Sequence, residues 1–145
     1  MRYHMLTAEL IRHSGRKARE LGHSYVGSVH LLLAMLTSRG TAGELLRGTG
    51  MDPVLTEKMT VILCGTGTPE LPLPQGFSSE AGQLLRQSAA EAKAHECREI
   101  APGHILLAMS RRKGGMVRQL LLLNGVDTDA LFTNTVDQMR WEAQS

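Results

Sequence analysis

The sequence has few aromatic residues, few cysteines, little net charge and no long apolar run. Aromatic residues make up only 3% of its 145 residues, and 22 leucines stand against 11 valines and isoleucines together. This balance excludes an all-β fold, because strands favour β-branched and aromatic side chains. The two cysteines are too few for a disulfide scaffold and have no CxxC spacing. With 16 basic and 14 acidic residues, the net charge of +2 is too balanced for an electrostatic nucleic-acid binder.

Membrane and export signals are also missing from the sequence. The longest apolar run, Leu31–Leu36, is far short of the roughly 20 residues that cross a bilayer. The first ten residues lack the apolar segment of a signal peptide. We therefore expect a cytoplasmic protein with no membrane partner and no nucleic-acid partner. The composition, 42% hydrophobic and 21% charged, is typical of a globular domain.

Two halves of the chain share one pattern. A shift of 74 residues places Tyr3 on Phe77 and aligns His30–Met35 with His104–Met109. After one extra residue in the second half, a shift of 75 keeps the same register. We interpret the halves as two tandem repeats. Further matched positions are Leu10 with Leu84, Gly40 with Gly115, Gly50 with Gly125, and Asp52 with Asp127.

Each repeat is predicted to contain four helices. The fold class is therefore all-α, with two pseudo-symmetric four-helix repeats over residues 1–64 and 77–141. They are joined by a linker, 65–76, in which three prolines and three glycines exclude a helix. In each repeat the second helix is almost wholly apolar and is expected at the centre of the bundle. The expected helices are 6–21, 28–36 with Ser28 as N-cap, 42–47, 53–63 after Asp52, 79–95 after Ser78, 102–110, 116–123, and 128–141 after Asp127.

The segment Leu21–Leu36 reads Leu-Gly-His-Ser-Tyr-Val-Gly-Ser-Val-His followed by an apolar run. With Gly40–Leu46, Phe77–Ala81 and Leu123–Val126, it resembles the N-terminal repeat of the AAA+ unfoldases of the ClpA/ClpC type. The resemblance covers nearly the whole chain, and the duplication is itself a trait of that family. The second repeat departs from the pattern at Glu96-Cys97, where the family has Gly-His.

The resemblance implies a protein-binding module without an enzymatic activity of its own. In the family, this domain receives protein clients or adaptor proteins and passes clients to an ATPase ring and its protease. No Gly-x-x-x-x-Gly-Lys-Ser/Thr motif is present, so these residues hold no phosphate cradle for ATP, and we expect no cofactor. The alternatives are a freestanding regulator that lacks its own ATPase and a helical DNA-binding protein. A small hydrolase is disfavoured because no nucleophile motif is present.

The ClpC branch of the family recognises phosphorylated arginine, and the resemblance places the corresponding positions here. The family's carboxylate falls on Val29 and Gly103, and its hydroxyl falls on His4 and Ser78. Both acids are missing, and one hydroxyl is kept as Ser78. Each charged hydrogen bond of this kind contributes roughly 1.5–3 kcal/mol. We therefore expect phosphoarginine recognition to be lost.

Two further pairs of equivalent residues are candidates for function. Tyr3 and Phe77 stand at equivalent helix starts, either as a shared apolar docking patch between the repeats or as hydrophobic staples. His30 and His104 begin the two apolar helices. We expect them to hydrogen-bond their loops rather than bind a metal, because His23, the nearby candidate ligand, has Cys97 as its equivalent in the second repeat. The basic run 111–113 is expected in a solvated loop, with a patch for acidic partners as the alternative.

Overall fold

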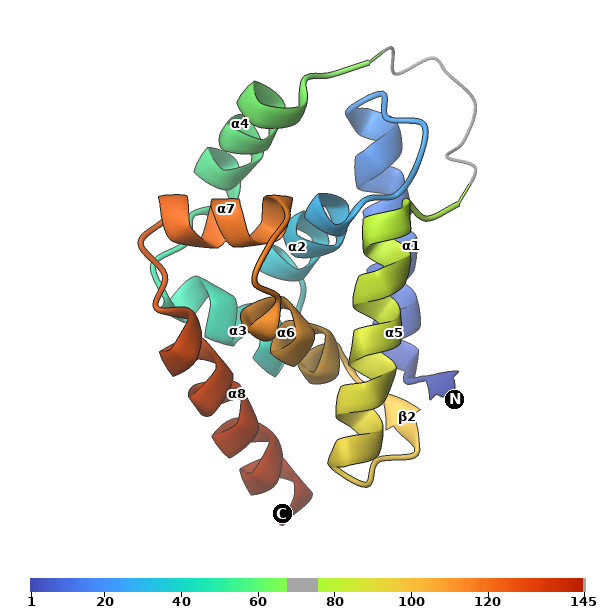
Figure 1. Ribbon diagram of the computed structural model, residues 1–145, viewed down its shortest axis with the longest axis vertical. Helices are drawn as coiled ribbons and strands as arrows, with labels where there is room; N and C mark the ends of the chain where they lie inside the picture. The colour runs from blue at the N-terminus through green and yellow to red at the C-terminus, as the bar shows by residue number, and fades with distance from the viewer. Residues whose placement is uncertain (68–75, 145) are drawn as a thin grey trace.

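The computed structural model describes residues 1–67 and 76–144, which form eight helices and one short strand pair (Figure 1). The all-α prediction is therefore confirmed, apart from two strands of two residues each. Most of the predicted linker, residues 68–75, lies outside the described residues. The helices are α1 Met5–Glu20, α2 Ser28–Leu36, α3 Thr41–Gly48, α4 Pro53–Cys64, α5 Ser79–Ala94, α6 Pro102–Arg111, α7 Met116–Leu123 and α8 Thr128–Ala143.

Three helices begin where a short polar side chain caps the first turn. Asp52, Ser78 and Asp127 each accept a hydrogen bond from the backbone N–H three residues further on, at 2.8, 3.1 and 3.0 Å. An N-cap acceptor satisfies one of the backbone donors that a helix start leaves unpaired. The predicted starts of α4, α5 and α8 are therefore confirmed, since each depends on one local residue.

The start of α2 differs from the prediction by one residue. Gly27, not Ser28, is the N-cap, and its backbone N–H donates to Nδ1 of His30 at 2.8 Å. The hydroxyl of Ser28 donates instead to the Glu80 carboxylate of the second repeat, at 2.8 Å. The serine therefore joins the two repeats rather than capping its own helix.

The two repeats exchange their opening segments. Strand β1 (Arg2–Tyr3) pairs in parallel with β2 (Glu99–Ile100), which precedes α6 in the second repeat. At the equivalent place, Phe77 forms a parallel bridge with Val26, which precedes α2 in the first repeat. Each opening segment thus lies against the loop that leads into the central helix of the other repeat. No strand was expected from the sequence, and this reciprocal pairing is the main difference between the predicted and the observed fold.

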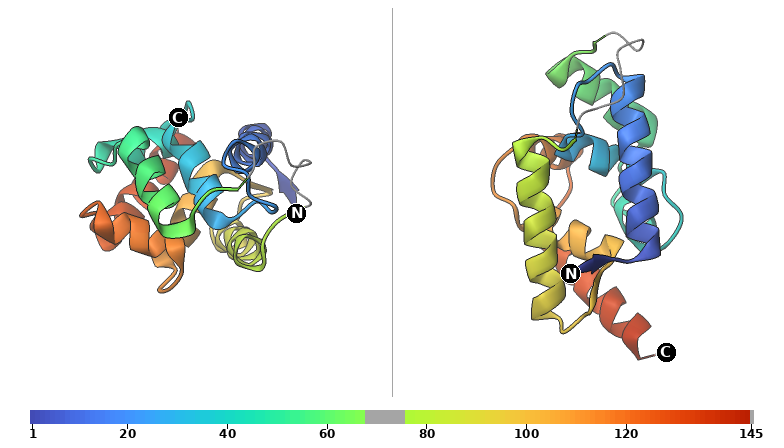
Figure 2. Two further views of the ribbon diagram at one scale, coloured as in Figure 1. Left: turned by 90° about the horizontal axis from the view of Figure 1, so that it is seen from above. Right: turned by 90° about the vertical axis from the view of Figure 1, so that its right-hand side faces the viewer.

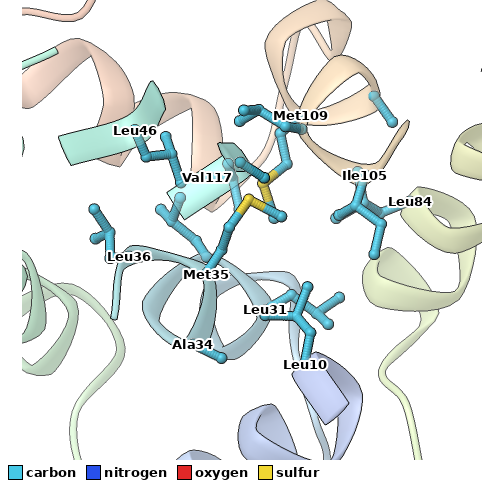
Figure 3. Close-up of a cluster of buried hydrophobic side chains, with 14 of the residues drawn as sticks. Leu10, Leu31, Ala34, Met35, Leu36, Leu46, Leu84, Ile105, Met109 and Val117 are labelled. Atoms are coloured by element: carbon cyan, nitrogen blue, oxygen red, sulfur yellow. The ribbon is translucent and has the colours of Figure 1, made fainter. Parts of the chain in front are cut away.

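One hydrophobic core runs through both repeats. All nine residues of α2 are buried, as predicted for a central helix, and α6 is buried along most of its length. Met35 and Met109, which are equivalent positions, meet at the centre of this core (Figure 3). Helices α1 and α5 lie on one side of the molecule and run antiparallel to each other (Figure 2). Within residues 1–67 and 76–144, no helix has both the length and the apolar character that a membrane span requires.

Candidate functional site

Tyr3 and Phe77 lie at opposite ends of the α1–α5 side of the molecule. Tyr3 precedes α1 and pairs beside Ile100, which follows α5, whereas Phe77 precedes α5 and pairs beside Val26, which follows α1. Each of these helices has 16 residues and is therefore about 24 Å long. Tyr3 and Phe77 therefore do not form one shared patch, which was one of the two alternatives for them. Instead there are two equivalent openings, each with an aromatic side chain that is 40% exposed.

The first opening joins the start of α1 to the start of α6 around a cavity of about 240 Å³. His4 caps α1, with Nδ1 accepting from the Leu6 N–H at 3.1 Å. Gly103, in the first turn of α6, lines the same cavity. A side chain on Gly103 would place its Cβ 2.6 Å from Sδ of Met139. Met139, from α8, therefore occupies the space that a carboxylate at residue 103 would need.

The second opening joins the start of α5 to the start of α2. The Ser78 hydroxyl accepts from the Ala81 N–H and so serves as the helix cap. Val29 is 7% exposed, so its side chain belongs to the core rather than to the surface. A carboxylate is nevertheless present, because Oε1 of Glu80 accepts from the Ser28 hydroxyl at 2.8 Å.

The predicted residues therefore meet across the repeats and not within one repeat. His4 of the first repeat shares a cavity with Gly103 of the second, and Ser78 of the second repeat lies beside the loop before Val29. Two helix N-termini converge at each opening, and their free N–H groups favour a negatively charged or hydrogen-bond-accepting ligand. Sequence reasoning missed Glu80, whose only signal was an acidic residue in the first turn of a helix.

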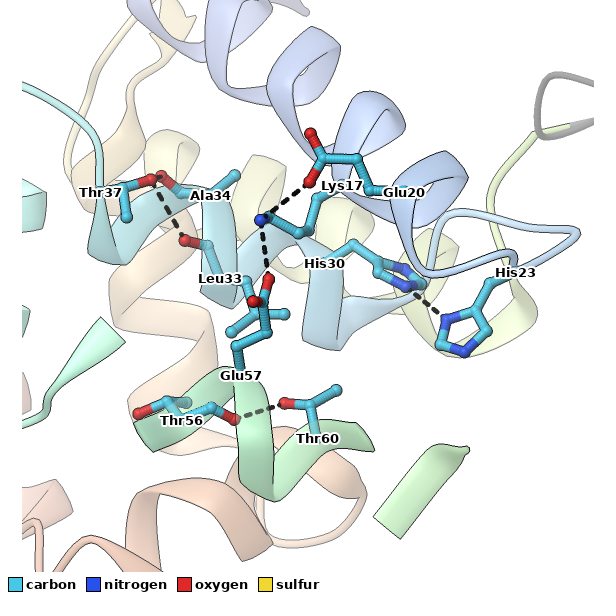
Figure 4. Close-up of polar contacts among 10 residues, drawn as sticks. All are labelled: Lys17, Glu20, His23, His30, Leu33, Ala34, Thr37, Thr56, Glu57 and Thr60. Atoms are coloured by element: carbon cyan, nitrogen blue, oxygen red, sulfur yellow. Dashed lines mark hydrogen bonds and ion pairs between the residues drawn. The ribbon is translucent and has the colours of Figure 1, made fainter. Parts of the chain in front are cut away.

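His30 takes part in a chain of hydrogen bonds that closes the α1–α2 loop (Figure 4). Its Nδ1 accepts from the Gly27 N–H, so the neutral ring carries its proton on Nε2 and donates it to Nδ1 of His23 at 2.8 Å. His23 then donates from Nε2 to the Gly65 carbonyl at 2.9 Å. Burial, and secondly the charge of His23, lower the pKa of His30 to about 4. This geometry agrees with the expectation that His30 hydrogen-bonds its loop.

His104 repeats only half of this arrangement. Its Nδ1 accepts from the Ala101 N–H at 2.9 Å, but its buried Nε2 has no hydrogen-bond partner among the described residues. The residue equivalent to His23 is Cys97, whose thiol turns to the His95 carbonyl. Burial, and secondly His95, lower the pKa of His104. In the described part of the chain, no three His, Cys, Asp or Glu side chains are grouped as metal ligands would be.

The basic run 111–113 is exposed at Arg111 and Lys113, as expected, but its two arginines have partners on neighbouring helices. Arg111 is the last residue of α6, and its guanidinium binds Glu91 at 2.8 Å and lies 4.8 Å from the ring centre of Phe132. The Arg112 guanidinium donates to two glutamine side chains of α5. Two of the three cations therefore hold α6 and its C-terminal turn against neighbouring helices.

Comparison with known proteins identifies the family to which this geometry belongs. The model of the Clp repeat N-terminal domain matches residues 4–66 and again residues 76–142. The chain belongs to the Clp N-terminal repeat domain family. Chloroplastic chaperone protein ClpC1 of Oryza sativa subsp. japonica is 28% identical over 123 residues, which are 83% of this chain and 13% of that protein. Chloroplastic ClpC of Pisum sativum is 27% identical over 132 residues, which are 89% of this chain and 14% of that protein.

Solved structures of Clp N-terminal domains have the same fold. The N-terminal domain of ClpD from Arabidopsis thaliana superposes with a TM-score of 0.79 at 19% identity, covering 96% of this chain and 95% of that one. The Hsp104 N-terminal domain from Candida albicans gives a TM-score of 0.77 at 17% identity, covering 96% and 92%. This Clp N-terminal domain therefore spans a whole domain of that fold but only about one seventh of the curated relatives it matches.

Proposed function

We propose that this Clp N-terminal domain is a protein-binding module that recruits protein clients or adaptors for delivery to a Clp ATPase ring and its protease. The observation that carries the proposal is the reciprocal exchange of the opening segments. It builds two equivalent openings, each of which has a half-exposed aromatic side chain beside two helix N-termini. Aromatic side chains next to free polar groups are typical anchors for polypeptide ligands.

A capture experiment tests this proposal at its two openings. The immobilised domain is mixed with an extract of its source cells, and bound proteins are compared for wild type, Tyr3→Ala, Phe77→Ala and the double variant. We expect each single change to reduce capture of specific proteins and the double change to reduce it further. Val54→Ala is the matched control, because this side chain at the start of α4 is 64% exposed and takes no part in either opening. Equal capture by all five proteins would contradict the role of the openings, and no specific capture by wild type would contradict the function.

Phosphoarginine is not an expected ligand of this domain. The family's carboxylate positions are Val29, which is buried, and Gly103, which is covered by Met139. The Glu80 carboxylate lies in the second opening, but it comes from α5 and is bound to Ser28. We predict weak binding or none when free phosphoarginine is titrated by calorimetry, because the charge partner of the guanidinium is missing. A dissociation constant in the micromolar range would contradict this prediction.

A matched variant shows whether the missing groups cause this loss. His4→Thr, Gly103→Glu and Met139→Ala together restore the family's hydroxyl and carboxylate at the first opening and remove the side chain that covers it. If the openings are otherwise competent, the triple variant binds phosphoarginine more tightly than wild type. Met139→Ala alone is the control, and it should not bind, because it supplies no carboxylate.

A further inference from the structure

A groove of about 490 Å³ lies between the first half of α1 and the turn that joins α2 to α3. Figure 2 shows this turn beside α1 in its right-hand view. Leu10 and Pro102 supply part of its lining, and three arginines surround it. Arg12 and Arg16 are one turn apart on α1, and Arg39 comes from the facing turn.

The three guanidiniums of this α1 groove have no ion-pair partner among the described residues. Arg12, Arg16 and Arg39 are exposed, and none lies within 4.0 Å of a carboxylate in residues 1–67 and 76–144. Lys17, the next cation along α1, is by contrast held by Glu20 at 3.0 Å and Glu57 at 2.7 Å (Figure 4). Glu9 also lines the groove. The formal charge of the groove is therefore +2 when His13 is neutral.

The charge of the groove also acts on His13, which lies within it. Burial lowers the pKa of this ring, and the charges of Arg16 and Lys17 lower it further, against the opposing effect of Glu20. A neutral imidazole leaves the guanidiniums as the cations of the groove. A positive potential of this kind attracts carboxylates.

On the equivalent surface of the second repeat the cavity is smaller, about 210 Å³, and Arg86 keeps the position of Arg12. Arg112 stands where the first repeat has Ser38, and it crosses this surface to donate to Gln83 at 2.9 Å and Gln87 at 3.2 Å. Those glutamines are the equivalents of Glu9 and His13, and Ala90 replaces Arg16. The Ser38 hydroxyl instead turns back to its own helix. The α1 groove is therefore the larger of the two cavities, and Arg16 has no basic counterpart in the second repeat.

We propose that the α1 groove binds an acidic segment of a protein partner, with aspartate or glutamate carboxylates on Arg12, Arg16 and Arg39. The proposal rests on the proposed function, because it takes the partner to be a protein. Arginine binds carboxylates through two parallel hydrogen bonds, and the apolar lining accepts the methylene groups of such side chains. Duplex DNA is disfavoured, because DNA-binding proteins neutralise about 6–10 phosphates and this groove offers three cations.

Fluorescence anisotropy with a fluorescein-labelled octaglutamate peptide tests the groove directly. At about 100 mM salt, where the Debye length is about 10 Å, wild type should bind this peptide and not octaglutamine. Arg12→Gln with Arg16→Gln should weaken binding about five- to thirtyfold, because two exposed ion pairs are lost. The matched control is Arg19→Gln with Arg86→Gln, which removes two exposed charges outside the groove and should change binding less than twofold.

Several outcomes would overturn the inference. They are no binding of octaglutamate, equal loss in both double variants, and tighter groove-dependent binding of a short DNA duplex than of the peptide. The capture experiment separates this inference from the proposed function. If wild type captures specific proteins and the groove variant captures them equally well, the inference fails while the proposed function stands. If octaglutamate binds at the groove and no protein is captured, the proposed function fails instead.

Discussion

At the scale of one residue, equivalent positions of the two repeats can have different partners, as His30 and His104 do. The rings of His30 and His104 accept a backbone N–H in the same way. Only His30 also finds a second ring, because the second repeat has Cys97 at the position of His23. A buried donor without a partner lowers the stability of the folded chain.

Replacing Cys97 by His should therefore stabilise the domain. The residue before position 97 already has the left-handed backbone conformation found before His23. Glu96 has a φ of 58°, and its equivalent Gly22 has a φ of 73°. The new Nδ1 can accept from Nε2 of His104, as His23 does from His30. We expect the free energy of unfolding to rise by about 1 kcal/mol in urea denaturation. Cys97→Ala removes the thiol without adding an acceptor, and a similar gain in that control would contradict the explanation.

The lowered pKa of His30 predicts a loss of stability in acid. The ring has a pKa of about 4 when folded and an ordinary value of 6.5, so between these values the unfolded chain binds a proton that the folded chain does not. This contribution is fully present above pH 6.5 and is lost as the pH falls towards 4. We expect about 3 kcal/mol of unfolding free energy to disappear across this window. His104 and His13, whose pKa values are also lowered, act in the same direction.

Urea unfolding of wild type and His30→Gln across this pH range checks the prediction. Glutamine keeps a hydrogen-bond acceptor and does not titrate, so the variant should lose about 3 kcal/mol less. An NMR titration of the His30 ring gives the pKa without relying on the fold of the variant. A ring that titrates near 6.5 in the folded wild type would contradict the assignment of its environment.

At the scale of the element, α4 is unusual because its buried residues are polar. Its two fully buried residues are Thr56 and Thr60, whereas several of its large apolar side chains are exposed. Thr60 donates to the Thr56 carbonyl at 2.9 Å (Figure 4), but the Thr56 hydroxyl has no partner among the described residues. The exposed apolar residues of α4 are Val54, Leu55, Ile62 and Leu63.

The two buried threonines of α4 should respond to the same substitution with opposite sign. Thr56→Val replaces an unpaired buried hydroxyl by a methyl group of similar size and should raise the free energy of unfolding by about 1 kcal/mol. Thr60→Val removes a hydrogen bond and should lower it by about 1 kcal/mol. Each variant is the control for the other, because the residues lie one helical turn apart on the same face. Changes of the same sign in urea denaturation would contradict this prediction.

Helix limits were predictable from the sequence where one residue determines them, and longer-range features were not. Asp52, Ser78 and Asp127 cap their helices through local hydrogen bonds, so their sequence signals were sufficient. The start of α2 was placed one residue late, because the sequence cannot tell that the Ser28 hydroxyl binds Glu80, 52 residues away. A polar residue has several possible partners, and tertiary packing selects one.

The candidate site shows the same limit. The sequence aligned Tyr3 with Phe77 as equivalent positions, and one of its two interpretations joined them into one patch. The antiparallel course of α1 and α5 keeps the two residues apart. Arg12 and Arg16 were visible one turn apart, yet the groove needs Arg39 from a turn that only the packed structure brings near. Contacts between residues that are far apart in the sequence depend on the whole fold.

At the scale of the whole molecule, the exchanged openings and the shared core make the two repeats one unit. The core cluster contains residues from every helix except α4, whose Met59 packs against it. Met35 and Met109 contribute equivalent, fully buried side chains from the two repeats (Figure 3). The Thr7 hydroxyl of the first repeat also donates to the Ile100 carbonyl of the second at 2.7 Å. Repeats that share one core are expected to unfold together.

Met35→Ala tests this cooperativity, because the domain has a single tryptophan, Trp141, and it lies in the other repeat. Truncating a fully buried methionine costs about 2–5 kcal/mol. If the repeats unfold as one unit, the urea transitions followed by Trp141 fluorescence and by helical circular dichroism coincide, and both move to lower urea. Met5→Ala is the control, since this methionine is 69% exposed and its truncation should move neither transition. A fluorescence transition that stays at the wild-type midpoint while the dichroism shows two steps would mean that the second repeat holds its structure without the first.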